Sequence, residues 1–251
     1  MIALFSATGN SRLVARSLAI LNANEPIIPI LTLTQDMVEG QDRIIWVFPV
    51  HAWGVPGVVE DVIGRLNFPP ATKHYMVATC GDDIGHTDRI WRQLIESRGG
   101  TTVGAFSIRM PNTYVLLPGM DTDSDSVAAG KLLDAPSRIE FIAKAIRHGM
   151  AITDIQPGAL PWLKSRLIRP FFRRFLMSPK PFHADPSRCA GCGRCAKACP
   201  LDNITLDTEK HPQWGDRCAT CLACFHVCSS HAVEYGGRTR RKGQYIAPKS
   251  L

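Results

Sequence analysis

Cysteine is almost missing from the first 188 residues of this 251-residue chain, where Cys80 is the only one. Long apolar runs are missing as well, since none approaches the ~20 residues that a membrane-spanning helix needs. No basic segment precedes the first apolar run, so we expect no secretory leader and a cytoplasmic protein. The motifs GxGxxG, GxxxxGKS and GxxxxGKT do not occur, which disfavours a dinucleotide or nucleoside triphosphate site.

Charge and cysteine are both unevenly distributed along the chain. Residues 1–150 contain 13 Lys and Arg against 15 Asp and Glu, a net −2, whereas residues 151–251 contain 16 against 7, a net +9. The other eight cysteines all lie between Cys189 and Cys228. A reducing compartment disfavours disulfides, so this crowding indicates metal. We therefore expect two modules, the second basic enough to attract an acidic partner.

The first module alternates apolar runs with helical patterns, which predicts a doubly wound parallel α/β sheet. Strands are expected at residues 2–6, 26–31, 43–50, 74–80 and 102–108, and helices at about 11–22, 55–66, 86–98 and 136–148. The apolar runs are continuous rather than alternating, as in strands buried on both faces. Ligands of such sheets bind beyond the carboxyl ends of the strands, where this chain has SATGNS, VHAWGVPG and TCGDDIG.

Two cysteine runs with the same spacing, C-x2-C-x2-C-x3-C, begin 29 residues apart. This is the spacing of bacterial ferredoxins, in which the fourth cysteine binds the cluster of the other run. A zinc module instead uses cysteine pairs separated by roughly 12–20 residues. The runs therefore predict two 4Fe–4S clusters, one held by Cys189, Cys192, Cys195 and Cys228 and the other by Cys199, Cys218, Cys221 and Cys224.

The segment FSATGNS (residues 5–11) connects the first expected strand to the first helix. Its residue types can cap a helix N-terminus, or they can hold a phosphate where backbone N–H groups and the helix dipole favour an anion. Without a P-loop lysine, the segment suits a compact phosphate monoester. Trp53 follows the third strand, beside the flexible backbone of Gly54, and can stack on a planar ring. Gly81 and Gly85 allow a ligand to approach the backbone closely after the fourth strand. Together these features predict FMN in a flavodoxin-like domain with strand order 2-1-3-4-5.

The motifs FSATGNS, FPVHAWGVP, ATCGDD and MPNTY and the two cysteine runs extend over nearly the whole chain. In these motifs the chain resembles the flavodoxin–ferredoxin fusion proteins of anaerobic bacteria and archaea. The resemblance implies a five-stranded flavodoxin-like FMN domain over residues 1–150, a basic helical linker over 151–182, and a small α+β ferredoxin domain with two 4Fe–4S clusters over 183–251. It also implies a phosphate site and a ring site for FMN, the first made by Ser6, Thr8, Gly9, Asn10 and Ser11, and the second by Pro49, His51, Ala52, Trp53, Gly54, Thr79, Cys80, Gly81 and Asp82.

Two departures from ordinary flavodoxins bear on the ring site. The loop after the fourth strand has no aromatic residue, so only Trp53 is expected to stack on the flavin, whose other face stays open. The second departure is that the first module is nearly neutral. Both departures agree with a basic cluster module that covers part of the flavin. The alternative for Trp53 is an ordinary core or surface aromatic. We expect His51 to shape its loop or bond a flavin oxygen, Cys80 to be a small buried hydrophobe, and Asn112 and Tyr114 to cap the site.

The segment 160–177 has apolar residues at positions 160, 163, 167, 171 and 175 among five cations. Such a helix can lie on a membrane surface, or it can pack its apolar face on the body of the protein. We favour the second interpretation and expect Pro170 to end or kink the helix. The Asp-rich segment 121–125 lacks the features of a calcium loop and is expected to be a solvated loop or the start of a helix. The basic tail GRTRRKGQY is expected to wrap the cluster domain or dock an acidic partner rather than bind nucleic acid.

These features predict an electron-transfer protein that passes electrons between FMN and two 4Fe–4S clusters and so connects one- and two-electron carriers. The alternative is an FMN-dependent reductase of a small acceptor, such as a quinone, a nitro compound or a metabolite, fed through the clusters. A third interpretation is a zinc-stabilised interaction module without redox function. Donor and acceptor proteins are expected as partners, whereas their identity, the direction of electron flow and the oligomeric state stay open.

Overall fold

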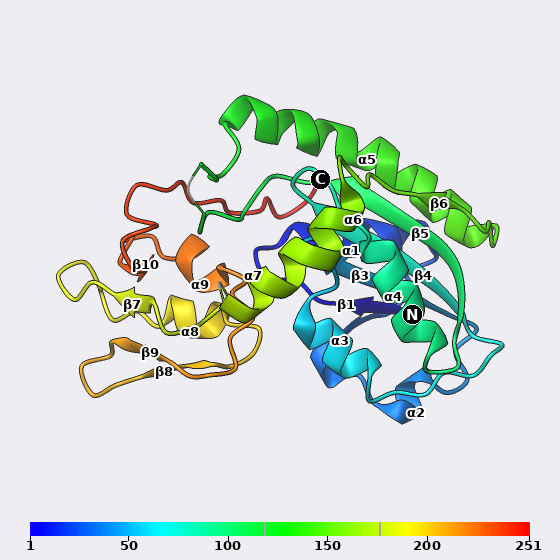
Figure 1. Ribbon diagram of the computed structural model, residues 1–251, viewed down its shortest axis with the longest axis horizontal. Helices are drawn as coiled ribbons and strands as arrows, with labels where there is room; N and C mark the ends of the chain where they lie inside the picture. The colour runs from blue at the N-terminus through cyan, green and yellow to red at the C-terminus, as the bar shows by residue number, and fades with distance from the viewer. Residues whose placement is uncertain (118, 176) are drawn as a thin grey trace.

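A computed structural model describes residues 1–117, 119–175 and 177–251 of the chain (Figure 1). Its first part is a sheet of parallel strands in the order β2-β1-β3-β4-β5-β6. The first five strands follow the order 2-1-3-4-5, so the predicted flavodoxin-like fold is confirmed. The strands are β1 (Ile2–Leu4), β2 (Ile27–Pro29), β3 (Arg43–Pro49), β4 (Lys73–Cys80), β5 (Thr101–Arg109) and β6 (Thr153–Asp154).

Helices cover both faces of this sheet, as a doubly wound fold requires (Figure 1). They are α1 (Asn10–Leu21), a 3-10 turn (Ile30–Thr32), α2 (Gln35–Val38), α3 (Gly57–Ile63), α4 (Thr87–Glu96) and α5 (Asp125–Arg147). One core joins the sheet to α1 and α5, and a second joins it to α3 and α4. Strand β3 contributes Ile45 and Val47 to the first core and Trp46 and Phe48 to the second. These side chains are fully buried, because a central strand of such a sheet is covered on both sides.

Two details of the sheet domain differ from the prediction. The sheet has a sixth strand, β6, which pairs with β5 over only Thr153 and Asp154; a polar strand of two residues has no apolar run that could predict it. Helix α5 begins at Asp125 rather than at residue 136, with Ser124 as its N-cap and Pro136 inside it. The Asp-rich segment 121–125 is therefore a loop over residues 121–124 that leads into the helix at Asp125, which agrees with both of its expected structures.

The cysteine-rich region is a small α+β unit, as predicted. Its two antiparallel strand pairs and two short helices are β7 (Phe182–Ala184) with β10 (Val233–Tyr235), β8 (Ile204–Leu206) with β9 (Pro212–Trp214), α8 (Arg194–Ala198) and α9 (Ala223–His226). Its core also contains Val115 and Leu116, which come from the loop after β5 and are 0% and 1% exposed. The His226 ring lies 2.8 Å from the Thr113 carbonyl of the same loop. The loop after β5 thus fastens the two regions together.

The linker between the regions consists of α6 (Pro161–Leu163), a π-helical turn (Lys164–Ile168) and α7 (Arg169–Phe175). Of the two outcomes expected at Pro170, an end of the helix is wrong: the helix continues, because a π turn precedes the proline and changes the hydrogen-bond register there. The expectation that the apolar stripe packs on the body is also wrong. Its members Leu163, Leu167, Phe171 and Phe175 are between 36% and 65% exposed. No helix in the described part of the chain is both long and apolar enough to cross a membrane.

Candidate functional site

A cavity of about 240 Å³ lies at the carboxyl ends of β1, β3 and β4, the edge of the sheet where we expected a ligand. The three loops that form its walls are distant in sequence and meet because these strands are neighbours in the sheet. Eight of the predicted FMN-site residues line the cavity: Thr8, Pro49, His51, Ala52, Trp53, Cys80, Gly81 and Asp82.

Six other predicted residues are not among the described residues that line the cavity: Ser6, Gly9, Asn10, Ser11, Gly54 and Thr79. Their contacts brace the surrounding loops. The hydroxyls of Ser11 and Thr79 lie 2.8 Å apart, and both side chains are buried. The Asn10 amide donates to the Pro111 carbonyl at 2.8 Å, and its oxygen accepts from the Tyr245 hydroxyl at 2.9 Å. The Ser6 hydroxyl accepts from the backbone N–H of Arg12 at 3.2 Å, so Ser6 caps the first turn of α1.

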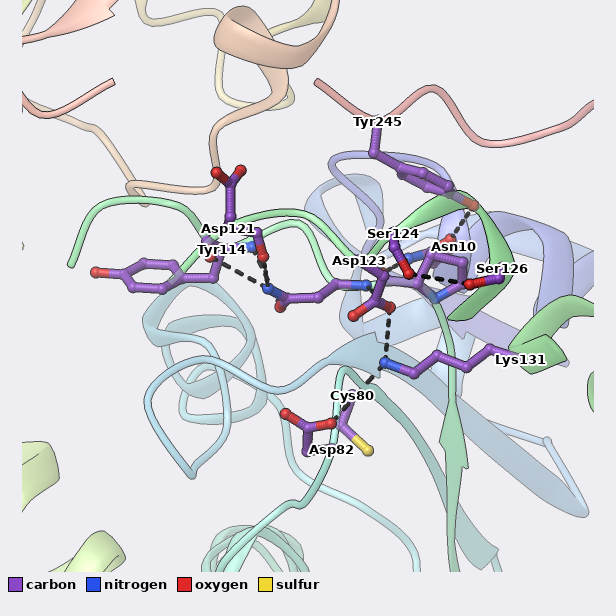
Figure 2. A network of polar contacts seen from close by, with 12 residues as sticks. Asn10, Cys80, Asp82, Tyr114, Asp121, Asp123, Ser124, Ser126, Lys131 and Tyr245 are labelled. Atoms are coloured by element: carbon purple, nitrogen blue, oxygen red, sulfur yellow. Dashed lines mark hydrogen bonds and ion pairs between the residues drawn. The ribbon is translucent and has the colours of Figure 1, made fainter. Parts of the chain in front are cut away.

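The N-terminus of α1 lies beneath the C-terminal tail. Its N-cap, Gly9, has a left-handed φ of 107°, which glycine adopts without strain. A Cβ on Gly9 would lie 2.6 Å from the Cβ of Ala247, so the tail passes directly over this loop. Figure 2 shows the Tyr245 ring beside the loop, with its hydroxyl bonded to Asn10. The first turn of this 12-residue helix still offers backbone N–H groups to an anion.

The loop after β3 is a tight turn that presents Trp53 to the cavity. His51 and Gly54 exchange two backbone hydrogen bonds of 3.0 and 3.1 Å. Between them Ala52 and Trp53 both have left-handed φ angles, 47° and 54°, as in a type I′ turn. Non-glycine residues in this conformation carry strain, which is commonly found at ligand sites. Burial, reinforced by the Arg169 charge, lowers the pKa of His51 to about 4, so its ring is neutral near pH 7.

The linker holds this turn from its outer side. The Ser165 hydroxyl donates to the Trp53 carbonyl at 2.8 Å, and the Lys164 ammonium lies 5.6 Å from the centre of the Trp53 ring. Lys164 also forms a 2.6 Å ion pair with Asp83 in the loop after β4. The linker therefore fixes the relative position of two of the three loops that build the cavity. This role was not predicted, because Lys164 and Ser165 contact loops that lie 81 and 112 residues earlier in the sequence.

The loop after β5 supplies a further wall of the cavity. Asn112 and Tyr114, expected to cap the site, both line it, together with Phe172 of α7. The rings of Tyr114 and Phe172 are 5.8 Å apart, so Trp53 is not the only aromatic side chain available to a planar ligand. Asp123 accepts from the Asn112 backbone N–H at 2.9 Å and forms a 2.7 Å ion pair with Lys131, which fixes the loop (Figure 2).

The structure brings together the first predicted set of four cysteines. Cys189, Cys192, Cys195 and Cys228 line one small enclosed space, although Cys228 belongs to the second run. The Cys228 sulfur accepts from the Ala232 backbone N–H at 3.2 Å. Cys192 is exposed, so one corner of this set faces solvent. In the described part of the chain, no group of three or more His, Cys, Asp or Glu side chains is arranged to hold a single metal ion.

The second set of cysteines is also close together. Burial, with smaller contributions from the neighbouring Cys218 and Cys199, raises the pKa of the Cys221 thiol to about 12. Burial likewise raises the pKa of Cys224, with additional effects from the same three cysteines. Backbone N–H groups approach two of the sulfurs, from Asn203 to Cys199 at 3.4 Å and from Thr220 to Cys218 at 3.3 Å.

The two runs have the same backbone conformation with different residues. In the first run, Gly191 and Gly193 have left-handed φ angles of 61° and 68°. Thr220 and Leu222 occupy the equivalent positions of the second run with φ angles of 52° and 64°. These conformations are costly for side chains with a Cβ, so the second run needs a compensating contact.

Leu222 has such a contact, because it packs in the core of the cysteine-rich region with Val115 and Leu116. Thr220, Cys221 and Leu222 line the cavity together with Trp53 and Tyr114, and Leu222 is only 2% exposed. The second cysteine run therefore forms a wall of the cavity beyond the sheet. The expected proximity of the cluster module to the ligand site is present in the structure.

Comparisons with known proteins match one part of the chain to a family model and find similar solved structures. Residues 182–244 match the family model of the 4Fe-4S dicluster domain. No curated protein sequence matches the chain. Similar solved structures include the Fusobacterium nucleatum flavodoxin bound to flavin mononucleotide, which is 12% identical to this chain with a TM-score of 0.42. The match covers 59% of this chain and 95% of that flavodoxin. The Streptococcus pneumoniae TIGR4 flavodoxin is 13% identical, with a TM-score of 0.38 and coverage of 59% and 94%. The fold assignment depends on the observed strand order rather than on these likenesses.

Proposed function

We propose that this chain, which joins a flavodoxin-like sheet to a 4Fe–4S dicluster domain, passes electrons between FMN and two 4Fe–4S clusters. One observation carries the proposal: Cys221, a predicted cluster ligand, lines the same cavity as Trp53 and His51. A flavin in the cavity would be in van der Waals reach of the cluster-binding loop. The chain itself would then supply the path between a one-electron and a two-electron carrier.

The cavity suits FMN at both of its ends. At the phosphate end, Thr8 lines the cavity and the N-terminus of α1 lies in the same loop, with no acidic residue among positions 6–11. We assign Asn10 and Ser11 the role of bracing this loop, since both side chains are already bonded to protein groups. At the ring end, Trp53 and Tyr114 offer flat faces and Gly81 allows close backbone approach.

The cysteines suit two cubanes in the crossed arrangement of bacterial ferredoxins. Cys189, Cys192 and Cys195 would share a cluster with Cys228, with which they enclose one space. Cys218, Cys221 and Cys224 would share the other with Cys199, which is close enough to affect their pKa values. The N–H groups of Asn203, Thr220 and Ala232 would donate to ligand sulfurs and so help set the potentials.

We assign the residues around the cavity to binding FMN, orienting it and shielding it from water, rather than to a chemical step of their own. When bound, FMN exchanges one or two electrons and each cluster exchanges one. The neutral His51 ring can hydrogen-bond to a flavin heteroatom without adding a charge. Lys131, whose ammonium is held 2.7 Å from Asp123 and 3.9 Å from Asp82, places a cation at the mouth of the cavity. The cysteine-rich region excludes water from the side that the sheet leaves open.

The second candidate is an FMN-dependent reductase of a small acceptor. The observation in its favour is the apolar part of the cavity formed by Leu117, Met120 and Met177, which extends beyond the loops that would hold the flavin. A quinone or nitroaromatic compound could bind there beside the ring. Steady-state turnover of such acceptors with the reduced protein distinguishes the two functions, since a pure carrier gives no saturable turnover.

The experiment that tests the proposal starts from protein purified without oxygen. We expect about eight irons and one FMN per chain, and little zinc. After partial reduction by a one-electron donor, the flavin and cluster absorption bands should reach a common equilibrium at a rate independent of protein concentration. The Cys221→Ser variant should lose that intramolecular phase, whereas Leu133→Ser, at an exposed position on α5 outside the described cavity lining and both cysteine sets, should keep it. Zinc without iron or flavin, or a flavin that equilibrates only in bimolecular collisions, would overturn the proposal.

A further inference from the structure

The linker exposes a continuous apolar stripe. Leu163, Leu167, Phe171 and Phe175 recur every four residues and therefore lie along one side of the helix. They are 36%, 54%, 57% and 65% exposed. The rings of Phe171 and Phe175 are 4.9 Å apart and cover one end of the stripe. Trp162, at the other end, is 58% exposed. Soluble proteins seldom leave so many neighbouring large apolar side chains uncovered.

The charge around the stripe has one sign. Residues 155–184 contain six Lys and Arg and no Asp or Glu. Arg166 and Arg174 are exposed and have no recorded ion pair with a described carboxylate. The Arg174 guanidinium lies 5.8 Å from the centre of the Phe175 ring, at the edge of the stripe. An apolar strip with guanidinium groups at its margin matches the boundary between acyl chains and anionic headgroups.

The opposite side of the helix fixes this orientation. Arg169 donates to the Val55 carbonyl at 2.8 Å and forms an ion pair with Glu60, while Ser165 bonds Trp53. Both linker side chains are buried, at 8% and 5% exposure. The helix cannot rotate its stripe inward without breaking these contacts. The stripe is therefore a permanent outer surface of the protein, about 22 Å long for 15 residues.

We propose that the outer face of residues 160–175 binds the surface of an anionic lipid bilayer, with the helix lying parallel to the membrane plane. A protein partner or a second copy is less well matched. A protein surface that fits would need an apolar groove lined by carboxylates, and a second copy would bring arginines against arginines. Figure 1 shows the linker crossing from the sheet domain to the cysteine-rich region, so a bound membrane would face both. The inference is independent of the proposed redox function, since it requires only the linker.

Flotation of the purified full chain with lipid vesicles tests this inference. We expect binding to vesicles of phosphatidylcholine and phosphatidylglycerol, and weak binding to phosphatidylcholine alone. The double variant Phe171→Ser/Phe175→Ser should weaken binding at least about tenfold. Arg166→Gln and Arg174→Gln should each weaken it about fivefold and reduce its salt dependence. Leu133→Ser is the matched control, because Leu133 is 80% exposed on α5, away from the linker.

The fluorescence of Trp162 provides a second measurement. Trp46 and Trp91 are fully buried, Trp53 and Trp214 are partly buried, and Trp162 is 58% exposed. We expect a blue shift of the emission on addition of anionic vesicles, and its loss in Trp162→Phe assigns the shift to Trp162. The proposal is wrong if the wild-type protein does not float, or if the double serine variant floats equally well. It is also wrong if the wild type is a dimer that the double variant dissociates, because the stripe would then be a self-association surface.

Discussion

Gly54 is the position where the smallest possible change should have a large effect. A Cβ at this residue would lie 1.9 Å from the Arg169 Nε and 2.6 Å from its Cδ and Cζ. The backbone of Gly54 has no positive φ, so alanine is tolerated by the main chain and the clash is the whole effect. Arg169 is 8% exposed, and its guanidinium is held by the Val55 carbonyl and the Glu60 carboxylate. It cannot move aside without giving up these contacts.

The cost of Gly54→Ala follows from two effects. Overpacking of a close-packed region costs about 1–3 kcal/mol, and disrupting a largely buried ion pair costs up to about 3–5 kcal/mol. Because the guanidinium can keep part of its interaction with Glu60, we expect a loss of about 3 kcal/mol. For a domain of this size, that corresponds to a decrease of the melting temperature by about 6–12 °C. Urea denaturation and thermal denaturation of the intact chain both measure it.

Two further variants make the reasoning refutable. In an Arg169→Ala background, Gly54→Ala should cost almost nothing, because the atoms that it strikes are gone; the two changes are therefore strongly non-additive. Gly130→Ala, in α5 with no atom within 4 Å of the new Cβ, should stabilise the protein by about 0.5–1 kcal/mol. A Gly54→Ala cost below about 1 kcal/mol, or an equal cost in the Arg169→Ala background, would contradict the packing that we describe.

Three other changes have defined outcomes. Burial lowers the pKa of His74 from 6.5 to about 4, so the unfolded chain binds a proton at a higher pH than the folded chain does. The free energy of unfolding should therefore fall as the pH decreases from about 6.5 to 4, by at most roughly 3 kcal/mol. In denaturation experiments at several pH values, the free energy of unfolding of His74→Gln should depend less steeply on pH. Cys228→Ser should lower the iron content from about eight to about four per chain, measured by colorimetric assay, whereas an unchanged content would refute the crossed ligand sets. Tyr245→Phe removes a bond of about 1 kcal/mol to Asn10 and should accelerate FMN release about fivefold in fluorescence measurements; an unchanged rate would mean that the tail does not support the phosphate loop.

The sequence predicted the features that repeat or that follow strand and helix periodicity. The positions of the first five strands followed from the apolar runs of a buried parallel sheet, and their order followed from the flavodoxin-like fold that the loops predicted. Cysteine spacing predicted both groups of four, and the structure places the four members of the first group around one space. Eight of the expected cavity residues followed from one topological rule about the carboxyl ends of strands.

What the sequence did not reveal depends on contacts between distant segments. The linker's apolar stripe suggested a buried face, but Glu60 and Asp83 on the body attract its cations, and this pairing turned the stripe outward. Phe172 reaches the cavity from a helix that no periodicity relates to it. The strained Thr220 and Leu222 lie in a conformation that their residue types oppose. In each case tertiary structure overrides a local preference.

The tail that crosses Gly9 has a consequence for the order in which the protein is made. The tail is held by the cysteine-rich region, since Gln244 donates to the Phe225 carbonyl at 2.6 Å and the Tyr245 N–H donates to the His226 ring at 3.1 Å. The sheet domain leaves the ribosome first, before the tail and Leu222 exist. During that interval the α1 N-terminus and the cavity are open to solvent. Synthesis itself thus leaves a period in which a ligand can reach the cavity before the tail lies over the α1 N-terminus.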